Sequence, residues 1–311
     1  MISIPPALKK FKNRIGWDSI NHKYLRSHLE LCLLEEIGFP ENRKQIGDIT
    51  SNVCGIKEAG SAKIVAREEL IVCGLPLINV INEVFSAESL IINLLFKDGD
   101  LVKKGDVIGY IKGNQKHILL VERTILNFLQ RLSGIATKTK HFSKITESRG
   151  VSLLDTRKTT PGIRQLEKYA SACGGSYNHR MGLYDRILIK DNHLAAKSLY
   201  CNGLKKTSSF KSMLSEIKRK NADTITEVEI DTIDLLIPAI ESGIDAILLD
   251  NFTPQEIKKA VIINQNRVVL ESSGGINERS LDQYANAKPH FISTGAPIHS
   301  SRWLDIGLDW N

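Results

Sequence analysis

Residues 246–275 read AILLDNFTPQEIKKAVIINQNRVVLESSGG, and this stretch decides the fold class. It opens and closes with short, continuous apolar runs, 246–250 and 268–272, which are typical of strands buried on both faces of a parallel sheet. Between them, Thr253-Pro254-Gln255-Glu256 forms a capping box with proline at the first helical position, which predicts the start of a helix. The stretch therefore predicts one strand–helix–strand unit.

The same alternation continues on both sides of this unit. Further strands are expected at 151–156, 187–190, 225–230 and 291–294, with helical stretches between them. One of these helices, 209–220, carries its apolar side chains on a single stripe. Six or seven such units over about 150 residues favour a closed or nearly closed β/α barrel over an open sheet.

A smaller unit precedes the barrel. Residues 25–37 place apolar side chains at helical spacing, and Gly38 follows as a stop signal. Residues 60–112 contain short alternating segments punctuated by glycine turns, which predicts a strand-rich unit. A helix of about 20 residues is expected to begin near Arg123.

The composition is that of an ordinary soluble enzyme. The chain has 311 residues, of which 42% are hydrophobic and 25% are charged. Its five cysteines form no CxxC pair and no metal-ligand spacing, which is typical of reduced thiols in a cytosolic protein. No apolar run is long enough to span a bilayer, and the N-terminus lacks the apolar core of a signal peptide, so we expect a cytoplasmic protein without a membrane partner.

The net charge of +7 bears on the class of ligand. It comes without a basic tail and without a basic stripe interleaved with aromatic residues. A small anionic substrate explains it as well as nucleic acid does, and we expect no nucleic-acid partner.

Nearly every predicted barrel strand ends in a charged or glycine-rich group. The strand ends are Asp155–Lys158, Lys190–His193, Glu227–Glu229, Asp250-Asn251, Glu271–Gly275 and Ser293–His299. Because functional groups of a β/α barrel gather at the carboxyl ends of its strands, these groups should meet at one rim. Several cations on one rim form a pocket for a polyanion, since fixed charges in a partly dry site hold carboxylates and phosphates strongly. We therefore expect a small substrate with several negative charges.

Two of these loops, SSGG at 272–275 and STGAPIHS at 293–300, consist mainly of small residues and follow the last two strands. Barrels often bind a phosphate at this place, because glycine lets backbone N–H groups approach the oxygens closely. Together the two loops predict a phosphate site.

Glu229 and Asp250 end neighbouring strands, and the sequence leaves their role open. They could bind a Mg²⁺ that carries substrate phosphates, or bind the hydroxyls of a sugar. They could instead stabilise a developing positive charge, or form structural ion pairs with Lys190 or Lys158.

His179 has no serine or cysteine partner in a recognisable motif, which argues against a hydrolytic triad. It stands between Asn178 and Arg180. This position favours an anion contact for the histidine.

The run 155–193, DTRKTTPGIRQLEKYASACGGSYNHRMGLYDRILIKDNH, resembles the signature of the quinolinate phosphoribosyltransferase family. The likeness continues in ERTILNFLQRLSGIAT at 122–137, EVEID at 227–231, ILLDNFTP at 247–254, ESSGGI at 271–276 and GAPIHSSRWLDIGL at 295–308. EEIG and GDIT near residues 35–50, and AREELIVCGLP at 66–76, match the family's N-terminal domain. The resemblance covers nearly the whole chain after residue 25.

The resemblance implies an α/β fold with two parts: an N-terminal α/β domain, an α+β sandwich, followed by an incomplete, seven-stranded β/α barrel. The first domain would span residues 1–122 and the barrel residues 123–295, with a C-terminal tail, 296–311, packing on the first domain. It also implies an enzyme of de novo NAD biosynthesis. Quinolinate and phosphoribosyl pyrophosphate would give nicotinate mononucleotide, pyrophosphate and CO₂, with Mg²⁺ as cofactor.

The family's functional residues are carried over by motif. The resemblance implies that the quinolinate carboxylates are bound by Arg157, His179, Arg180, Lys190 and, from the neighbouring subunit, Arg123. It implies that Lys158, Glu229 and Asp250 are catalytic and handle the phosphoribosyl pyrophosphate, with the two carboxylates holding the Mg²⁺ directly or indirectly. It implies that the phosphoribosyl phosphate is held by Ser273, Gly274, Gly295 and His299. Because Arg123 would cross an interface, the smallest active unit would be a homodimer, and the sequence leaves open whether dimers pair into hexamers.

Three departures from the family pattern are visible. Residues 39–46 intervene where the family has a tighter connection, and the segment 195–224 is long and basic. Pro297 replaces an aliphatic residue in the last phosphate loop and removes one backbone donor.

Two other classes of protein compete with this interpretation. The first is a paralogue, either a pyrophosphorylase-like protein associated with molybdate transport or a nicotinate phosphoribosyltransferase. Lys190 argues against the former, and the joint presence of Arg123, Arg157, Arg180 and Lys190 favours a dicarboxylate over a monocarboxylate. The second is a non-catalytic scaffold that uses the 195–224 segment to bind nucleic acid or an acidic partner. The presence of every expected catalytic side chain argues against it.

Overall fold

The computed structural model describes residues 5–39, 47–85, 90–196, 200–201, 204–205 and 207–310. The 39–46 connection lies outside these ranges except for Phe39, and the 195–224 segment lies partly outside them. The chain divides into two compact units that alternate along the sequence. Unit 1 comprises Met1–Arg14, His141–Thr159 and Gly175–Ser300, and unit 2 comprises Ile15–Lys140, Thr160–Gly174 and Ser301–Asn311. The expected boundary between residues 122 and 123 falls inside one long helix, α5 (Gln115–Ser148).

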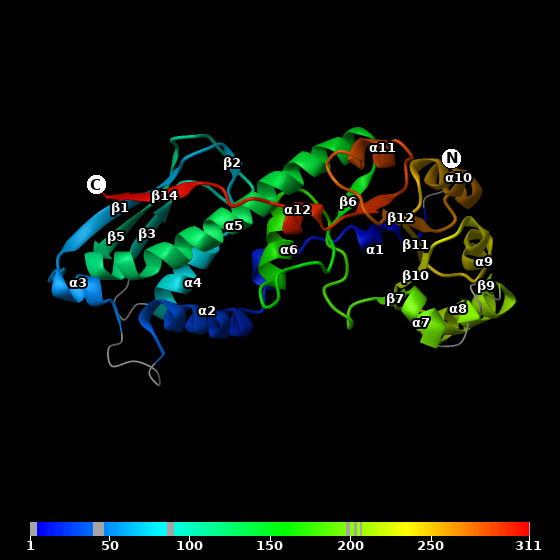
Figure 1. Ribbon diagram of the computed structural model, residues 1–311, viewed down its shortest axis with the longest axis horizontal. Coiled ribbons are helices and arrows are strands. Elements are labelled where there is room, and N and C mark those ends of the chain that lie inside the picture. The colour runs from blue at the N-terminus through cyan, green and yellow to red at the C-terminus, as the bar shows by residue number, and fades with distance from the viewer. Residues whose placement is uncertain are drawn as a thin grey trace. The chain divides into compact units, whose positions relative to one another are not determined.

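Unit 1 is built on a six-stranded parallel sheet in the order β6–β13–β12–β11–β10–β7 (Figure 1). Its strands are β6 (Ser152–Leu154), β7 (Ile187–Ile189), β10 (Thr226–Ile230), β11 (Ala246–Asp250), β12 (Val269–Ser273) and β13 (Phe291–Ser293). A parallel bridge between Leu154 and Tyr177 adds a seventh, single-residue segment beside β6. The described strands thus run from Tyr177 at one end to β7 at the other, which confirms the expected incomplete barrel.

Helices pack against the outer face of this sheet. The main ones are α8 (Thr207–Lys220), α9 (Leu236–Glu241), α10 (Pro254–Asn264), α11 (Leu281–Ala285) and the last part of α5. Apolar side chains from alternate strand positions, such as Val228, Leu249 and Leu270, pack on the first three of these helices. The predicted capping box begins α10: the Glu256 N–H donates to Thr253 Oγ1 at 3.3 Å, and the Thr253 N–H donates to Glu256 Oε2 at 2.8 Å.

The inner face of the sheet changes character along the strands. Near the amino ends of β11, β12 and β13 it is apolar, with Ala246, Val269 and Phe291 packed around Phe11 of α1 (Leu8–Phe11), together with Leu154 from the end of β6. Further along it carries the buried polar side chains of Glu227, Glu271 and Ser293. The apolar layer therefore closes one end of the barrel, and polar groups gather toward the other.

Shorter elements complete unit 1. They are α7 (Asp191–Ala196), the β8–β9 pair (Tyr200–Cys201 and Leu204–Lys205), the 3₁₀ turn η3 (Ile233–Leu235) and α12 (Ala296–His299). The helix α7 directly follows β7, so that the strand end at Lys190 lies between the two elements.

Unit 2 contains an antiparallel sheet in the order β14–β1–β5–β3. These strands are β1 (Ala59–Ala66), β3 (Ile91–Leu94), β5 (Val107–Asn114) and β14 (Ile306–Trp310), and a small pair joins β2 (Leu70–Ile71) to β4 (Leu101–Val102). The helices of this unit are α2 (His22–Ile37), α3 (Ile49–Val53), α4 (Leu75–Phe85), α6 (Arg164–Cys173) and the first part of α5, with the 3₁₀ turn η1 (Trp17–Ser19). The C-terminal strand β14 pairs with β1.

The structure corrects two details of the sequence interpretation. The segment 60–112 is strand-rich as expected, with strands β1 to β5, but it also contains the helix α4, whose side chains are mostly buried. The long helix begins at Gln115, not near Arg123, and has 34 residues. Within the described part of the chain, no helix combines the length and the apolar character needed to cross a membrane.

Candidate functional site

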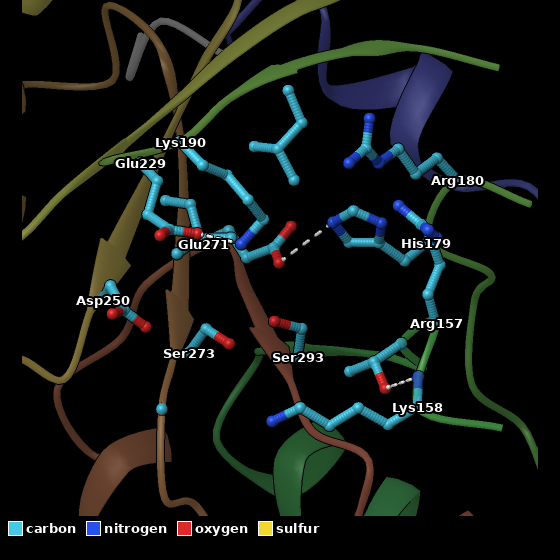
Figure 2. A pocket seen from close by; sticks show the side chains of 14 residues that line it. Arg157, Lys158, His179, Arg180, Lys190, Glu229, Asp250, Glu271, Ser273 and Ser293 are labelled. Carbon is cyan, nitrogen blue, oxygen red and sulfur yellow. Dashed lines mark hydrogen bonds and ion pairs between the residues drawn. The ribbon is translucent and has the colours of Figure 1, made fainter. Parts of the chain in front are cut away.

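A pocket of about 270 Å³ opens at the carboxyl ends of the unit 1 strands (Figure 2). It is lined by Thr156, Arg157, Lys158, His179, Arg180, Leu188, Lys190, Glu229, Leu248, Asp250, Glu271, Ser273, Gly274 and Ser293. All of these residues belong to unit 1. The pocket therefore gathers the strand ends that the sequence had placed on one rim.

Strand geometry explains why these side chains converge. Successive side chains of a strand point to opposite faces, so residues two apart share a face. Glu271 and Ser273 on β12 obey this rule, as do Leu188 and Lys190 at β7. The intervening residues, such as Ile189, pack outward against the helices.

A cationic wall forms one side of the pocket. Arg157, His179 and Arg180 lie along it in Figure 2, and Glu229 and Asp250 lie opposite. The Arg180 side chain is buried, and Arg157 is half-buried. Burial, reinforced by the neighbouring charge of Arg157, lowers the pKa of Arg180.

Two donors of this wall are unused. Among the described residues, the buried Nε atoms of Arg157 and Arg180 have no hydrogen-bond partner. A buried donor without an acceptor costs free energy, which binding of an anion would recover. This wall is therefore suited to binding carboxylate or phosphate oxygens.

Two fully buried carboxyl groups lie beside His179. Its Nε2 atom is 3.5 Å from Glu271 Oε1 and 3.8 Å from Glu227 Oε2, and Arg186 Nη1 donates to Glu227 Oε2 at 3.3 Å. Burial raises the pKa of Glu227, although the charge of Arg186 opposes the shift. Burial and the charge of Glu227 raise the pKa of Glu271 well above its ordinary value. Of the two carboxyl groups, Glu227 is therefore the more acidic, because Arg186 contacts it.

Lys190 and Glu229, from the ends of the adjacent strands β7 and β10, form an ion pair on one side of the pocket. This is one of the interpretations that the sequence left open for Glu229. Asp250, on the next strand, accepts a hydrogen bond from Asn251 Nδ2 at 2.8 Å. Burial raises the pKa of Asp250, and the charge of Lys190 opposes the shift.

The two small-residue loops approach their neighbours closely. Gly274 has a φ of +99°, and a Cβ atom there would lie 2.2 Å from Asn251 Oδ1. A Cβ atom on Gly295 would lie 2.9 Å from His299 Cδ2 and 3.3 Å from Lys158 Cβ. Both positions therefore need glycine, the first for its conformation as well as its size.

Pro297 lies in the first turn of α12, where a backbone N–H has no partner within the helix. Its missing donor therefore does not disturb the helix. His299, at the end of α12, is exposed.

The structure brings together nine of the residues expected at the site: Arg157, Lys158, His179, Arg180, Lys190, Glu229, Asp250, Ser273 and Gly274. Gly295 and His299 lie next to these residues, because Gly295 is close to both Lys158 and His299. Arg123 is an exposed residue of α5 and belongs to unit 2.

Five lining residues had no role assigned from the sequence, although three of them lie within the strand ends expected at the rim: Thr156, Leu188, Leu248, Glu271 and Ser293. Three of them stand two positions before an expected residue on the same strand, namely Leu188, Leu248 and Glu271. Strand periodicity was the signal that could have found them.

Comparisons with known proteins identify the family of this chain. The family model for the quinolinate phosphoribosyl transferase C-terminal domain matches residues 135–309, and the model for the N-terminal domain matches residues 48–133. The chain belongs to the quinolinate phosphoribosyltransferase family. A Bacillus subtilis member, named probable nicotinate-nucleotide pyrophosphorylase [carboxylating], is 39% identical over 93% of this chain and 94% of that protein.

Two further members show the breadth of this family. A mitochondrial quinolinate phosphoribosyltransferase [decarboxylating] of Nicotiana glauca is 33% identical over 91% of this chain and 81% of that protein. The solved structure of the nicotinate-nucleotide pyrophosphorylase from Francisella tularensis superimposes with a TM-score of 0.85 at 34% identity, covering 96% of this chain and all of that one. The family's α/β fold is therefore present across nearly the whole chain.

Proposed function

We propose that this protein transfers the phosphoribosyl group of phosphoribosyl pyrophosphate to quinolinate with loss of CO₂, giving nicotinate mononucleotide and pyrophosphate in de novo NAD biosynthesis. One observation carries the assignment of substrate. The Arg157 and Arg180 guanidinium groups flank His179 and present two buried, unused Nε–H donors to one pocket. Two adjacent ring carboxylates would supply the acceptors that these donors lack.

The other half of the pocket suits the phosphoribosyl donor. Lys158, Glu229 and Asp250 are assigned to its catalytic handling, and Ser273, Gly274, Gly295 and His299 to its phosphate. The close backbone approach at Gly274 and Gly295 supports the phosphate role, since such loops let N–H groups reach phosphate oxygens. Lys158 is exposed toward the pocket, where it can pair with pyrophosphate oxygens.

The chemistry needs no general base in its first step. The attacking pyridine nitrogen carries no proton, so the N–C1′ bond forms as the bond from C1′ to pyrophosphate breaks. The carboxylates of Glu229 and Asp250 can stabilise the positive charge that develops on the ribose. The Arg157–His179–Arg180 wall holds the ring carboxylates, so that the nitrogen is oriented for attack.

Decarboxylation uses the product of that step. The ring nitrogen is now cationic, and its charge stabilises the electron pair that stays on the adjacent carbon when the C–CO₂ bond breaks. A proton then replaces CO₂ at that carbon. The protein contributes mainly by holding the ring while the carboxylate leaves.

Mg²⁺ is the cofactor that fits this donor set. Glu229 and Asp250 end adjacent strands and offer carboxylate oxygens, the ligands that Mg²⁺ prefers together with substrate phosphates. These two residues would hold the ion, directly or through the substrate, and the ion would neutralise charge on the pyrophosphate. Glu229 also pairs with Lys190, so the pair would have to open for Glu229 to contact the ion.

We further propose a homodimer in which Arg123 reaches the quinolinate site of the neighbouring subunit. The exposure of Arg123 on α5 leaves it available for such a contact. Mixing Arg123→Ala subunits with Lys158→Ala subunits should restore activity at sites that combine the two intact residues. Mixed samples as inactive as either variant alone would contradict this role. A cytoplasmic location is proposed on the scattered cysteines of the sequence.

One assay tests the proposed reaction. Purified protein with Mg²⁺ should release CO₂ from quinolinate only when phosphoribosyl pyrophosphate is present. Turnover of nicotinate but not of quinolinate would replace the assignment with that of a nicotinate phosphoribosyltransferase. Arg180→Ala should abolish quinolinate binding with an unchanged circular dichroism spectrum, and an unchanged affinity would show that the carboxylate wall lies elsewhere.

A further inference from the structure

Asp155 is a buried carboxylate that lies behind the pocket and not in its lining. It follows β6 directly and is 2% exposed. Its backbone N–H donates to the Tyr177 carbonyl at 3.1 Å, and the Tyr177 N–H donates to the Leu153 carbonyl at 2.8 Å. The segment before His179 is thereby paired alongside β6.

The Asp155 side chain extends this pairing by two further hydrogen bonds. Asp155 Oδ1 accepts from the His179 backbone N–H at 2.8 Å, and Asp155 Oδ2 accepts from Asn178 Nδ2 at 2.6 Å. Both donors belong to residues directly before Arg180, and Asp155 itself stands two residues before Arg157. One carboxylate therefore connects the two loops that carry the guanidinium groups of the cationic wall.

Repulsion between like charges favours separation of these two loops. Each places a guanidinium group in the same pocket, and both Nε donors are buried without an acceptor. Like charges that share a partly dry site repel each other. Asp155 belongs to the loop that carries Arg157 and is hydrogen-bonded to the loop that carries Arg180. Its buried negative charge therefore opposes this separation.

We infer that Asp155 is a positioning residue that fixes the spacing of Arg157 and Arg180 and so makes the wall selective for two adjacent carboxylates. The inference rests on the proposed binding of quinolinate to this wall. Asp155 does not contact the substrate in this assignment, since it is not among the lining residues. It acts through the backbone of His179 and the side chain of Asn178.

The primary test is Asp155→Asn in the full-length protein. The amide has one acceptor where the carboxylate has two, so its NH₂ group must face one of the two donors. The dissociation constant of quinolinate, measured by calorimetry, and its KM should both rise by about tenfold or more, as expected for the loss of a hydrogen bond to a charged group. The KM of phosphoribosyl pyrophosphate should stay within about threefold of the wild-type value.

A reciprocal variant provides the rescue. In Asp155→Asn/Asn178→Asp the donor and the acceptor exchange places, so the new amide can donate to the new carboxylate and still accept from the His179 N–H. Both hydrogen bonds and the single negative charge return. Quinolinate affinity should recover to within about threefold of wild type, which a general loss of folding would not allow.

Asp98→Asn is the matched control. Asp98 is likewise a carboxylate that accepts hydrogen bonds from two N–H donors, here the backbone groups of Gly74 and Leu75 at 2.9 Å each, but it lies in unit 2. The Asp98→Asn substitution should lower the melting temperature and leave the ratio of the KM of quinolinate to the KM of phosphoribosyl pyrophosphate unchanged. A shift of that ratio equal to the shift in Asp155→Asn would overturn the specific role of Asp155.

Two further outcomes would also overturn the inference: unchanged quinolinate affinity in Asp155→Asn, or no recovery in a folded reciprocal variant. Wild-type protein provides the separate check on the proposed function. If wild type binds no quinolinate, the assignment of substrate fails. If wild type binds quinolinate and Asp155→Asn binds it equally well, only the positioning role fails.

Discussion

The buried pair Glu227 and Glu271 gives a sharp prediction, because the two carboxyl groups are chemically alike but the same substitution should cost much more stability at one than at the other. Both side chains are 0% exposed, on strands β10 and β12. Two ionised carboxylates with oxygen atoms within 4.8 Å of each other in a dry site would repel strongly, so we expect the pair to hold one proton at neutral pH. The charged member is Glu227, since Arg186 donates to it at 3.3 Å.

The substitutions are Glu227→Gln and Glu271→Gln. Glu227→Gln leaves the Arg186 guanidinium, which is 7% exposed, without its counterion. Removing one partner of a buried ion pair costs about 3–5 kcal/mol. Glu271→Gln replaces a neutral acid with a neutral amide of similar shape, and should cost about 1 kcal/mol or less. The two variants should therefore differ by at least about 2 kcal/mol.

The assay is urea unfolding at pH 7, followed by far-ultraviolet circular dichroism, which reports on both units. The pH dependence gives an independent check. The pKa of Glu271 in the folded protein is raised above its ordinary value of 4.5, so the unfolded chain releases this proton first. This contribution to stability is present below pH 4.5 and is lost as pH rises toward the raised pKa, by about 1.4 kcal/mol per pH unit.

Glu271→Gln lacks this loss, so its stability should improve relative to wild type as pH rises above 5. Equal destabilisation by the two variants at pH 7 would refute the assignment of the proton. So would a difference between wild type and Glu271→Gln that does not change with pH.

Two further predictions concern stability away from the pocket. Burial lowers the pKa of His290 from 6.5 to about 4. The free energy of unfolding of wild type should therefore fall by about 3 kcal/mol as pH is lowered from 6.5 to 4. Urea titrations of His290→Asn should show no such additional loss. The control substitution is conservative, because an asparagine oxygen can still accept the Leu270 N–H that His290 Nδ1 accepts at 2.9 Å. Thr253→Ala removes the cap of α10 and should cost about 1 kcal/mol in the same assay, whereas Thr253→Ser should cost less than half of that.

The barrel could be predicted from the sequence because its signals are local. The capping box at Thr253 and the apolar runs at 246–250 and 268–272 each lie within a few residues, and the structure has a helix and two strands there. The rim residues could also be predicted, since the end of a parallel strand fixes the side of the sheet on which a residue lies. Arg157, Lys190 and Asp250 were found in this way.

Other features depended on tertiary contacts that have no local signal. The helix α4 was missed because it is apolar on most of its surface, and burial on all sides removes the periodicity that identifies a helix. Asp98 precedes a glycine and is typical of a turn in the sequence, but its carboxylate accepts hydrogen bonds from Gly74, from Leu75 at the start of α4 and from Tyr169. None of these donors is near it in the sequence.

The buried acids were placed at strand ends from the sequence, but their roles were missed for a related reason. Their placement explains how a cationic pocket can exist without its ligand. A wall that binds a dianion needs an excess of positive charge, which is unfavourable when the pocket is empty. A carboxylate facing the ligand would relieve this charge but would compete with the ligand for the same donors. Asp155 and Glu227 avoid this conflict, because they are buried behind the wall and bind the His179 backbone and Arg186. The negative charge thus stabilises the loops and leaves the Nε atoms of Arg157 and Arg180 available to the ligand.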